Sequence, residues 1–67
     1  MKIIINGKAK QFDSENMTVS GLVATLNLTG KRLAIEKNGE IVPRSQFADV
    51  HLQEGDTLEI VGAVGGG

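Results

Sequence analysis

Apolar residues in this chain either alternate with polar ones or recur at helical spacing, in short stretches separated by turn residues. The first stretch is the β-branched run Ile3–Ile5, closed by Asn6-Gly7, a strong signal for a β-hairpin. A second strand, Lys8 to Phe12, is expected to fold back on it. A strict two-residue turn would put two lysines of this strand on the face of the isoleucines, which favours a longer or bulged loop.

The next stretch has the period of an amphipathic helix of two to three turns. Thr18 is the expected N-cap, and Gly30 is well placed to end the segment. Gly21 lies inside it at a cost of ~1 kcal/mol against alanine. This helix therefore depends on packing against a sheet, and its apolar stripe is formed by Val19, Leu22, Val23 and Leu26.

Apolar and polar residues alternate again after the helix, and this pattern predicts a second hairpin. A strand around Leu33 and Ile35 is followed by the turn Asn38-Gly39 and a short strand, Glu40-Ile41-Val42, which Pro43 stops. One helical turn is expected from Ser45 to Asp49, with Phe47 pointing inward as a core residue rather than a docking aromatic. Arg44, next to Pro43, is either a partner contact or a solvated turn residue.

The last strand is predicted at Thr57–Val61, with Leu58 and Ile60 on one face. The order β-β-α-β-β-β predicts an α+β fold in which a mixed β-sheet carries one main helix on one face. The crossover rule makes the strand after the helix parallel to an earlier strand of the same sheet. We expect one domain over residues 1–61 and a flexible C-terminal tail over residues 62–67.

Composition limits what so small a domain can do. The chain has 67 residues, 7.1 kDa and no cysteine, so it has neither disulfides nor thiolate metal sites. Its core must be thin, and a deep pocket of ~300–1,000 Å³ would consume much of it. A complete enzyme is therefore not expected.

Charge divides the chain in two. The seven Lys and Arg residues all lie within residues 1–44, which carry four acidic residues and a net charge of +3. Residues 45–67 have no Lys or Arg and a net charge of −4, from Asp49, Glu54, Asp56 and Glu59. This is either an ordinary solvated surface or an acidic face that meets a basic partner.

The chain lacks the marks of nucleic-acid and membrane proteins. Its pI of about 5.7 and two aromatic residues argue against nucleic-acid binding. No apolar run approaches the ~18 residues of a membrane span, and the first residues begin a strand pattern rather than a signal peptide. We therefore expect a cytoplasmic protein.

The sequence ends Gly62-Ala63-Val64-Gly65-Gly66-Gly67 directly after the last predicted strand. Such a run is often only a frayed end or a cloning remnant. Glycine also suits chemistry at a terminal carboxyl group, because it fits a narrow channel and tolerates any backbone conformation there. The Gly67 carboxylate is the candidate reactive group. It is ionised at neutral pH and a poor electrophile, so a partner must activate it, for example by adenylation with ATP.

Two sequence blocks and the glycine tail give the chain a family resemblance. The most specific block is Asn38-Gly39-Glu40-Ile41-Val42-Pro43-Arg44-Ser45-Gln46-Phe47, and a more widespread one is Gln53 to Val61. With Val64-Gly65-Gly66-Gly67, they resemble the ThiS family of sulfur carriers, which have the β-grasp, ubiquitin-like fold. Met1 to Asn6 and Thr18 to Leu26 match more loosely.

The resemblance implies a specific role for the tail. A ThiF-like adenylyltransferase would convert the Gly67 carboxylate to an acyl-adenylate with ATP and magnesium, while the chain itself binds no cofactor or metal. A cysteine-desulfurase relay would supply sulfur for a C-terminal thiocarboxylate, and a ThiG-like thiazole synthase would take that sulfur for the thiazole ring of thiamine. Val64, Gly65, Gly66 and Gly67 would enter the partner's active site, and the acidic surface around Glu59 would dock.

Other functions remain open at this stage. A molybdopterin-synthase small subunit also ends in Gly-Gly, although the block from Asn38 to Phe47 argues against it. A ubiquitin-like modifier would be conjugated to lysines through Gly67. A plain β-grasp interaction module would make no use of the tail.

Overall fold

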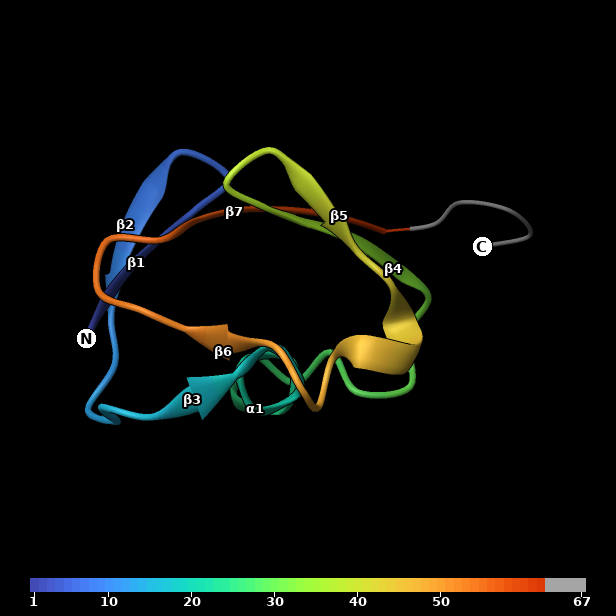
Figure 1. The fold of residues 1–67 in the computed structure, drawn as a ribbon, viewed down its shortest axis with the longest axis horizontal. Helices are drawn as coiled ribbons and strands as arrows, with labels where there is room; N and C mark the ends of the chain where they lie inside the picture. Colours follow the sequence, from blue (N-terminus) through green and yellow to red (C-terminus); the bar gives the residue numbers. More distant parts are fainter. Residues whose placement is uncertain (63–67) are drawn as a thin grey trace.

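A mixed five-stranded sheet forms one layer of the molecule, and a single helix forms the other (Figure 1). The computed structural model describes residues 1–62. The sheet strands lie in the order β2-β1-β7-β4-β5. Their bounds are β1 Lys2–Ile5, β2 Lys8–Gln11, β4 Leu33–Lys37, β5 Glu40–Val42 and β7 Thr57–Gly62. The predicted α+β, β-grasp architecture is confirmed.

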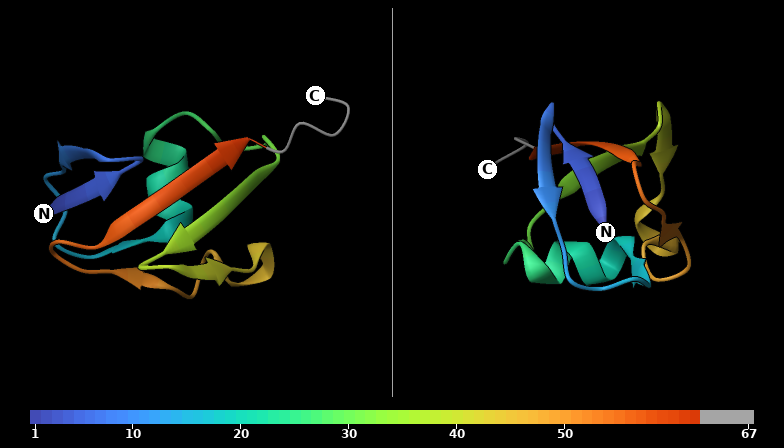
Figure 2. Two further views of the ribbon diagram at one scale, coloured as in Figure 1. Left: turned by 90° about the horizontal axis from the view of Figure 1, so that it is seen from above. Right: turned by 90° about the vertical axis from the view of Figure 1, so that its left-hand side faces the viewer.

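Helix α1, Val19–Thr25, lies across one face of the sheet, as both views of Figure 2 show. The predicted N-cap is confirmed, since the Thr18 hydroxyl accepts a hydrogen bond from the Gly21 N–H at 3.0 Å. The predicted end at Gly30 is wrong. The helix stops after Thr25, and Asn27 adopts the left-handed conformation with φ 60° that ends it. Gly30 serves a later turn, with φ 86°.

The apolar stripe of the helix packs on the inward-facing residues of the strands. Five of the side chains in this core are almost completely shielded from solvent: Ile3, Val19, Leu22, Ile35 and Leu58. Leu58 and Ile60 both face it from β7, as predicted, and Phe47 packs against it half-buried. The helix is therefore stabilised by its contact with the sheet, since seven residues alone would not stay helical.

Strand directions follow the crossover rule. Strand β1 pairs antiparallel with β2 and parallel with β7, while β7 pairs antiparallel with β4. Strand β4, which follows the helix, therefore runs in the direction of β2, as predicted, with two strands between them. Strand β7 occupies the centre of the sheet.

The first hairpin has the strict two-residue turn, so the expected bulged loop is wrong. Ile5 pairs with Lys8 and Ile3 with Lys10, and Asn6 and Gly7 both have positive φ. The lysines are tolerated because β2 is the edge strand and all four of its residues are exposed. Lysines on an edge strand also discourage pairing with other chains.

The structure also contains a second, two-stranded sheet that was not predicted from the sequence. Strands β3, Met17–Thr18, and β6, His51–Leu52, pair antiparallel beside the helix (Figure 1). The helical turn expected at residues 45–49 is a 3-10 turn, η1, at Arg44–Gln46. It begins directly after Pro43, which follows the last residue of β5.

Candidate functional site

Strand β7 carries the chain toward its C-terminal tail from the middle of the sheet. It pairs with β1 on one side and β4 on the other, and its Leu58 is 0% exposed. The ladder with β4 reaches Gly62, which pairs with Leu33. Gly62, assigned to the tail from the sequence, is thus the last residue of this strand. The predicted tail residues Val64, Gly65, Gly66 and Gly67 lie outside the described residues.

Both Asn-Gly turns also hydrogen bond to β7 through the asparagine side chains. The Asn6 amide group donates to the Ile60 carbonyl at 3.0 Å and accepts from the Ile60 N–H at 2.8 Å. From the other side, the Asn38 carboxamide oxygen accepts from the Thr57 N–H at 3.0 Å. Each side chain therefore supplies β7 with hydrogen bonds at the end of a neighbouring strand.

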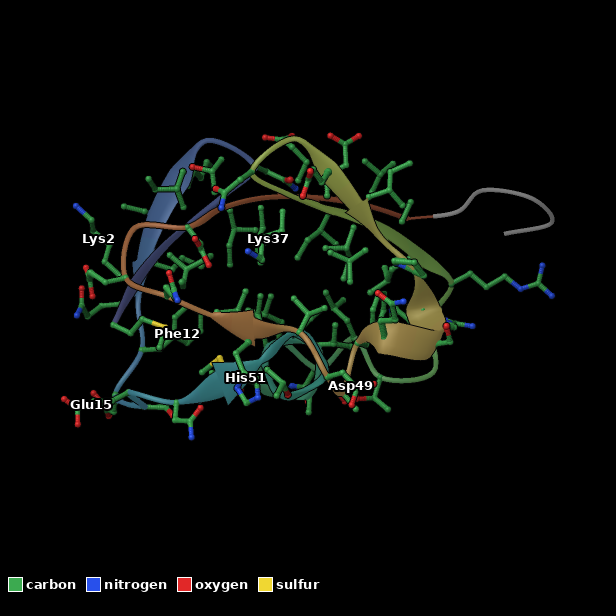
Figure 3. The ribbon with its side chains drawn as sticks, viewed as in Figure 1. Lys2, Phe12, Glu15, Lys37, Asp49 and His51 are labelled. Carbon is green, nitrogen blue, oxygen red and sulfur yellow. The ribbon has the colours of Figure 1, made fainter. Side chains whose placement is uncertain are left out.

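Asp56 anchors the start of β7 and does not belong to the acidic surface in which the sequence placed it. Its side chain is buried and accepts hydrogen bonds from the Asn38 side-chain NH₂ at 3.0 Å and the Gln53 N–H at 2.8 Å. The Lys37 ammonium lies 3.9 Å away, and Figure 3 shows Lys37 on the sheet side of the interior. This network joins the second hairpin to β7.

Glu59 lies on the face of the sheet away from the helix. It is exposed and pairs directly with Glu36 on β4, which in turn pairs with Ile41 on β5. Ile41 is 75% exposed and Val61 60% exposed, and both are unusually open for large apolar side chains. We call the group Ala34, Glu36, Ile41, Glu59 and Val61 the outer sheet face. It combines two carboxylates with exposed apolar surface next to the strand that leads into the tail.

The described residues offer little for catalysis or metal binding. Within residues 1–62, no three His, Asp or Glu side chains are grouped to hold a metal ion. His51, exposed on β6, has its Nδ1 3.2 Å from the Asn16 side-chain oxygen. It lies beside β3, as Figure 3 shows, and not near the end of β7.

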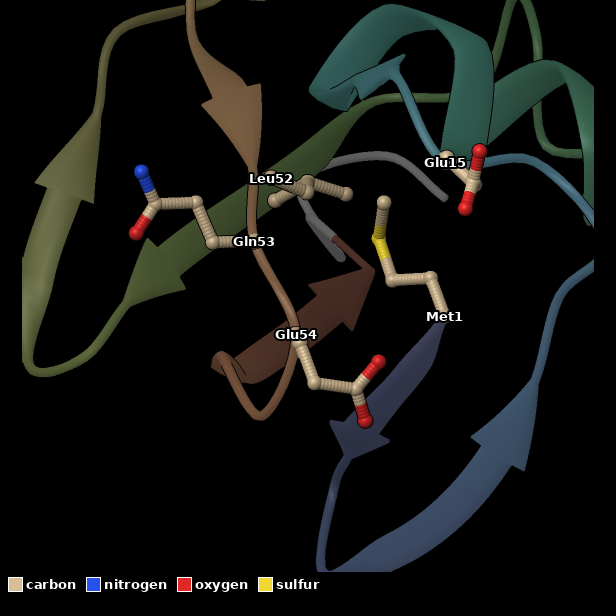
Figure 4. Close-up of a pocket in the computed structure, with 5 residues that line it drawn as sticks. All are labelled: Met1, Glu15, Leu52, Gln53 and Glu54. Carbon is tan, nitrogen blue, oxygen red and sulfur yellow. The ribbon is translucent and has the colours of Figure 1, made fainter.

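A hollow of about 360 Å³ lies at the opposite end of the molecule from Gly62. Figure 4 shows its lining by Met1, Glu15, Leu52, Gln53 and Glu54. Glu54 already accepts a hydrogen bond from the Lys2 N–H at 3.0 Å, so this carboxylate serves the fold. The exposed carboxylates and apolar side chains of the outer sheet face lie instead on β7 and its neighbours β4 and β5.

Comparison with known proteins decides the family. The family model described as "ThiS family" matches residues 3–67. The chain belongs to the ThiS family. The sulfur carrier protein ThiS of Bacillus subtilis is 35% identical over 63 residues, which cover 94% of this chain and 96% of that protein. A crystal structure of the thiamine biosynthesis protein ThiS from Geobacter metallireducens superposes with a TM-score of 0.87, at 30% identity and full coverage of both chains.

A second kind of relative is a much longer protein. A thiazole synthase from Paramagnetospirillum magneticum is 46% identical over all 67 residues, and the chain spans only 20% of that protein's length. A ThiS-like segment and a thiazole synthase therefore occur there in one polypeptide.

Family membership agrees with the resemblance in the sequence. It makes this chain a ThiS-type sulfur carrier of thiamine biosynthesis. It favours that function over the molybdopterin-synthase, modifier and plain interaction alternatives. As for membranes, none of the helices among residues 1–62 has the length and apolar character that a crossing requires.

Proposed function

We propose that this ThiS-family chain carries sulfur as a thiocarboxylate on Gly67. A ThiF-like adenylyltransferase, using ATP and magnesium, activates the carboxylate. Its oxygen attacks the α-phosphorus of ATP and pyrophosphate leaves. The outer sulfur of a protein persulfide, supplied by a cysteine-desulfurase relay, then attacks the carbonyl carbon and AMP leaves, which gives an acyl disulfide between Gly67 and the relay protein. A second thiol attacks the relay protein's sulfur in this disulfide, so a new disulfide forms there and the Gly67 thiocarboxylate leaves.

The observation that carries this proposal is the central position of β7. Its ladder with β4 extends to Gly62, and two asparagine side chains hold its edges. Five residues follow Gly62 in the sequence, and an extended chain of that length spans at most ~17 Å. An enzyme that acts on Gly67 must therefore come close to the residues that surround Gly62.

The tail alone would bind weakly, because ordering each of its residues costs ~1–2 kcal/mol. The affinity must come from a folded surface, and the outer sheet face is next to the end of β7. Its exposed Ile41 and Val61 would supply the apolar contact, and Glu36 and Glu59 would select a basic partner surface. Because these carboxylates face each other across the strands, a basic partner would also relieve their repulsion.

Thiazole synthase is the proposed acceptor of the sulfur. The thiazole synthase of P. magneticum contains a segment like this chain, which supports a direct encounter between carrier and enzyme. The chain acts here as a substrate of partner enzymes and performs no catalysis itself. We place these ATP-dependent steps in the cytoplasm.

The adenylation step gives a direct test. The chain is incubated with a ThiF-type enzyme, ATP and magnesium, and pyrophosphate release is measured. The full chain should support release, and a chain that lacks Gly67 should not, although its circular dichroism is unchanged. Release that continues without Gly67 would refute the assignment of the reactive group.

The docking surface is tested in the same assay. Glu59→Lys should raise the KM for the carrier, because it reverses a charge on the outer sheet face. The matched control is Asp49→Lys, which makes the same change at an exposed position beyond η1. Equal KM values for the two variants would rule out docking through Glu59.

A further inference from the structure

A groove with a basic rim lies between α1, the loop that leads into β4, and η1. Strand β4 begins and strand β7 ends at this end of the molecule (Figure 1). The volume of the groove is about 300 Å³. Its floor is apolar, formed by Val23 of α1, Leu28, Leu33 and Phe47, and its rim includes Lys31 and Arg44. Leu33 belongs both to this groove and to the pair with Gly62. The groove thus begins where β7 leads into the tail.

Arg44 is held in place at this groove, and the basic residues at and beside the groove are not neutralised within the described chain. The Arg44 guanidinium donates a hydrogen bond to the Lys31 carbonyl at 2.6 Å, which fixes it against the loop between α1 and β4. Lys31, Arg32 and Arg44 are all exposed, and none forms an ion pair with another residue of the range 1–62. Three of the seven basic residues of the chain therefore gather at one end of the molecule.

The outer sheet face and this groove lie on opposite sides of β7, and they carry opposite charge. A partner that encloses the residues after Gly62 must meet both sides. A nucleotide at the far end of an extended tail would lie up to ~17 Å from Gly62. This distance is much longer than an arginine side chain. These cations would therefore contact the partner's surface at the mouth of its channel and not the nucleotide.

We propose that this basic groove docks an acidic segment of thiazole synthase, in which carboxylates flank one apolar side chain. The proposal rests on the proposed function, because it takes thiazole synthase as a partner. The apolar side chain enters the groove over Leu33 and Phe47. The carboxylates pair with Lys31 and Arg44 at the rim, and the exposed Arg32 adds positive charge beside it. Charge complementarity and contact with the floor together give the groove its selectivity.

The charge part of the proposal is tested by reversing two cations. The full chain is titrated with a thiazole synthase that lacks a carrier segment of its own, and Kd is measured at low and at physiological salt. Lys31→Glu/Arg32→Glu should weaken binding by about tenfold at low salt and by less at physiological salt. Lys8→Glu/Lys10→Glu, which makes the same change on the distant edge strand β2, should have little effect.

The groove itself is tested by filling it. Ser20 lines the groove from α1, and Ala24 is exposed on the same helix without lining it. Ser20→Trp should weaken binding, and Ala24→Trp should not. The proposal is overturned if either test variant binds as well as its control.

The adenylation assay keeps this result separate from the proposed function. If the wild-type chain supports pyrophosphate release by the ThiF-type enzyme and the test variants bind thiazole synthase normally, the docking groove alone is refuted. Wild-type chain that supports no pyrophosphate release would refute the carrier function, whatever the binding result.

Discussion

Replacing Asn38 by glycine removes one side-chain amide without disturbing its turn. Asn38 has φ 53°, which glycine adopts readily, so the hairpin geometry survives. The substitution removes the hydrogen bond to buried Asp56 and the one from the Thr57 N–H. A hydrogen bond to a charged group contributes ~1.5–3 kcal/mol and a neutral one ~0.5–1.5 kcal/mol. Because the site is only partly buried, we expect a loss of about 2 kcal/mol in the free energy of unfolding.

Asn6→Gly is the matched control for this change. It also replaces the first residue of an Asn-Gly turn, so the change in unfolded-state entropy is the same. Its two lost hydrogen bonds go to the Ile60 backbone and involve no charge. We expect a loss of about 1 kcal/mol.

Urea unfolding followed by circular dichroism measures both values, and an Asp56→Ala background isolates the charged partner. In that background the two asparagine substitutions should cost about the same. If Asn38→Gly is no more costly than Asn6→Gly in the wild-type chain, or if the difference survives without Asp56, the network does not anchor β7 as described.

Three further substitutions test the helix and the outer sheet face. Gly21→Ala should stabilise the protein by ~0.5–1 kcal/mol in urea unfolding, because alanine has the higher helix propensity. The added Cβ has room, since it would lie 3.4 Å from Met17 Cγ and meet no closer atom. Destabilisation would show that this glycine is required. Thr18→Ala should cost about 1 kcal/mol and lower the helical circular dichroism signal, because the N-cap bond to Gly21 is lost; an unchanged signal would contradict the cap. Glu36→Lys should raise the midpoint of thermal unfolding by pairing with Glu59, and a lower midpoint would contradict the inferred repulsion.

Features with a local pattern could be predicted from the sequence. Both Asn-Gly turns, the cap at Thr18 and the burial of Leu58 follow from residue types and spacing within one element. Strands β3 and β6 were missed because two residues are too few to show a period. The sequence favoured a longer or bulged loop in the first hairpin, and this was wrong because an edge strand tolerates lysines on a face that is buried elsewhere in the sheet.

The candidate site was also predicted from the sequence only in part. The tail and its reactive terminus were inferred from sequence, and Glu59 is exposed next to the end of β7 as the docking prediction requires. Asp56 has the same charge, but its burial depends on Asn38 and Gln53, which meet it only through folding. The basic groove likewise joins Lys31 to Arg44 across thirteen positions, a contact that no spacing rule predicts.

The central claim is that Gly67 carries the sulfur, and intact-mass measurement tests it most directly. The chain is incubated with a ThiF-type enzyme, ATP, magnesium and a cysteine-desulfurase sulfur source, then fragmented in the mass spectrometer. The account predicts a gain equal to the difference between one sulfur and one oxygen, located on Gly67. An unchanged mass, or a sulfur found on any other residue, would contradict it.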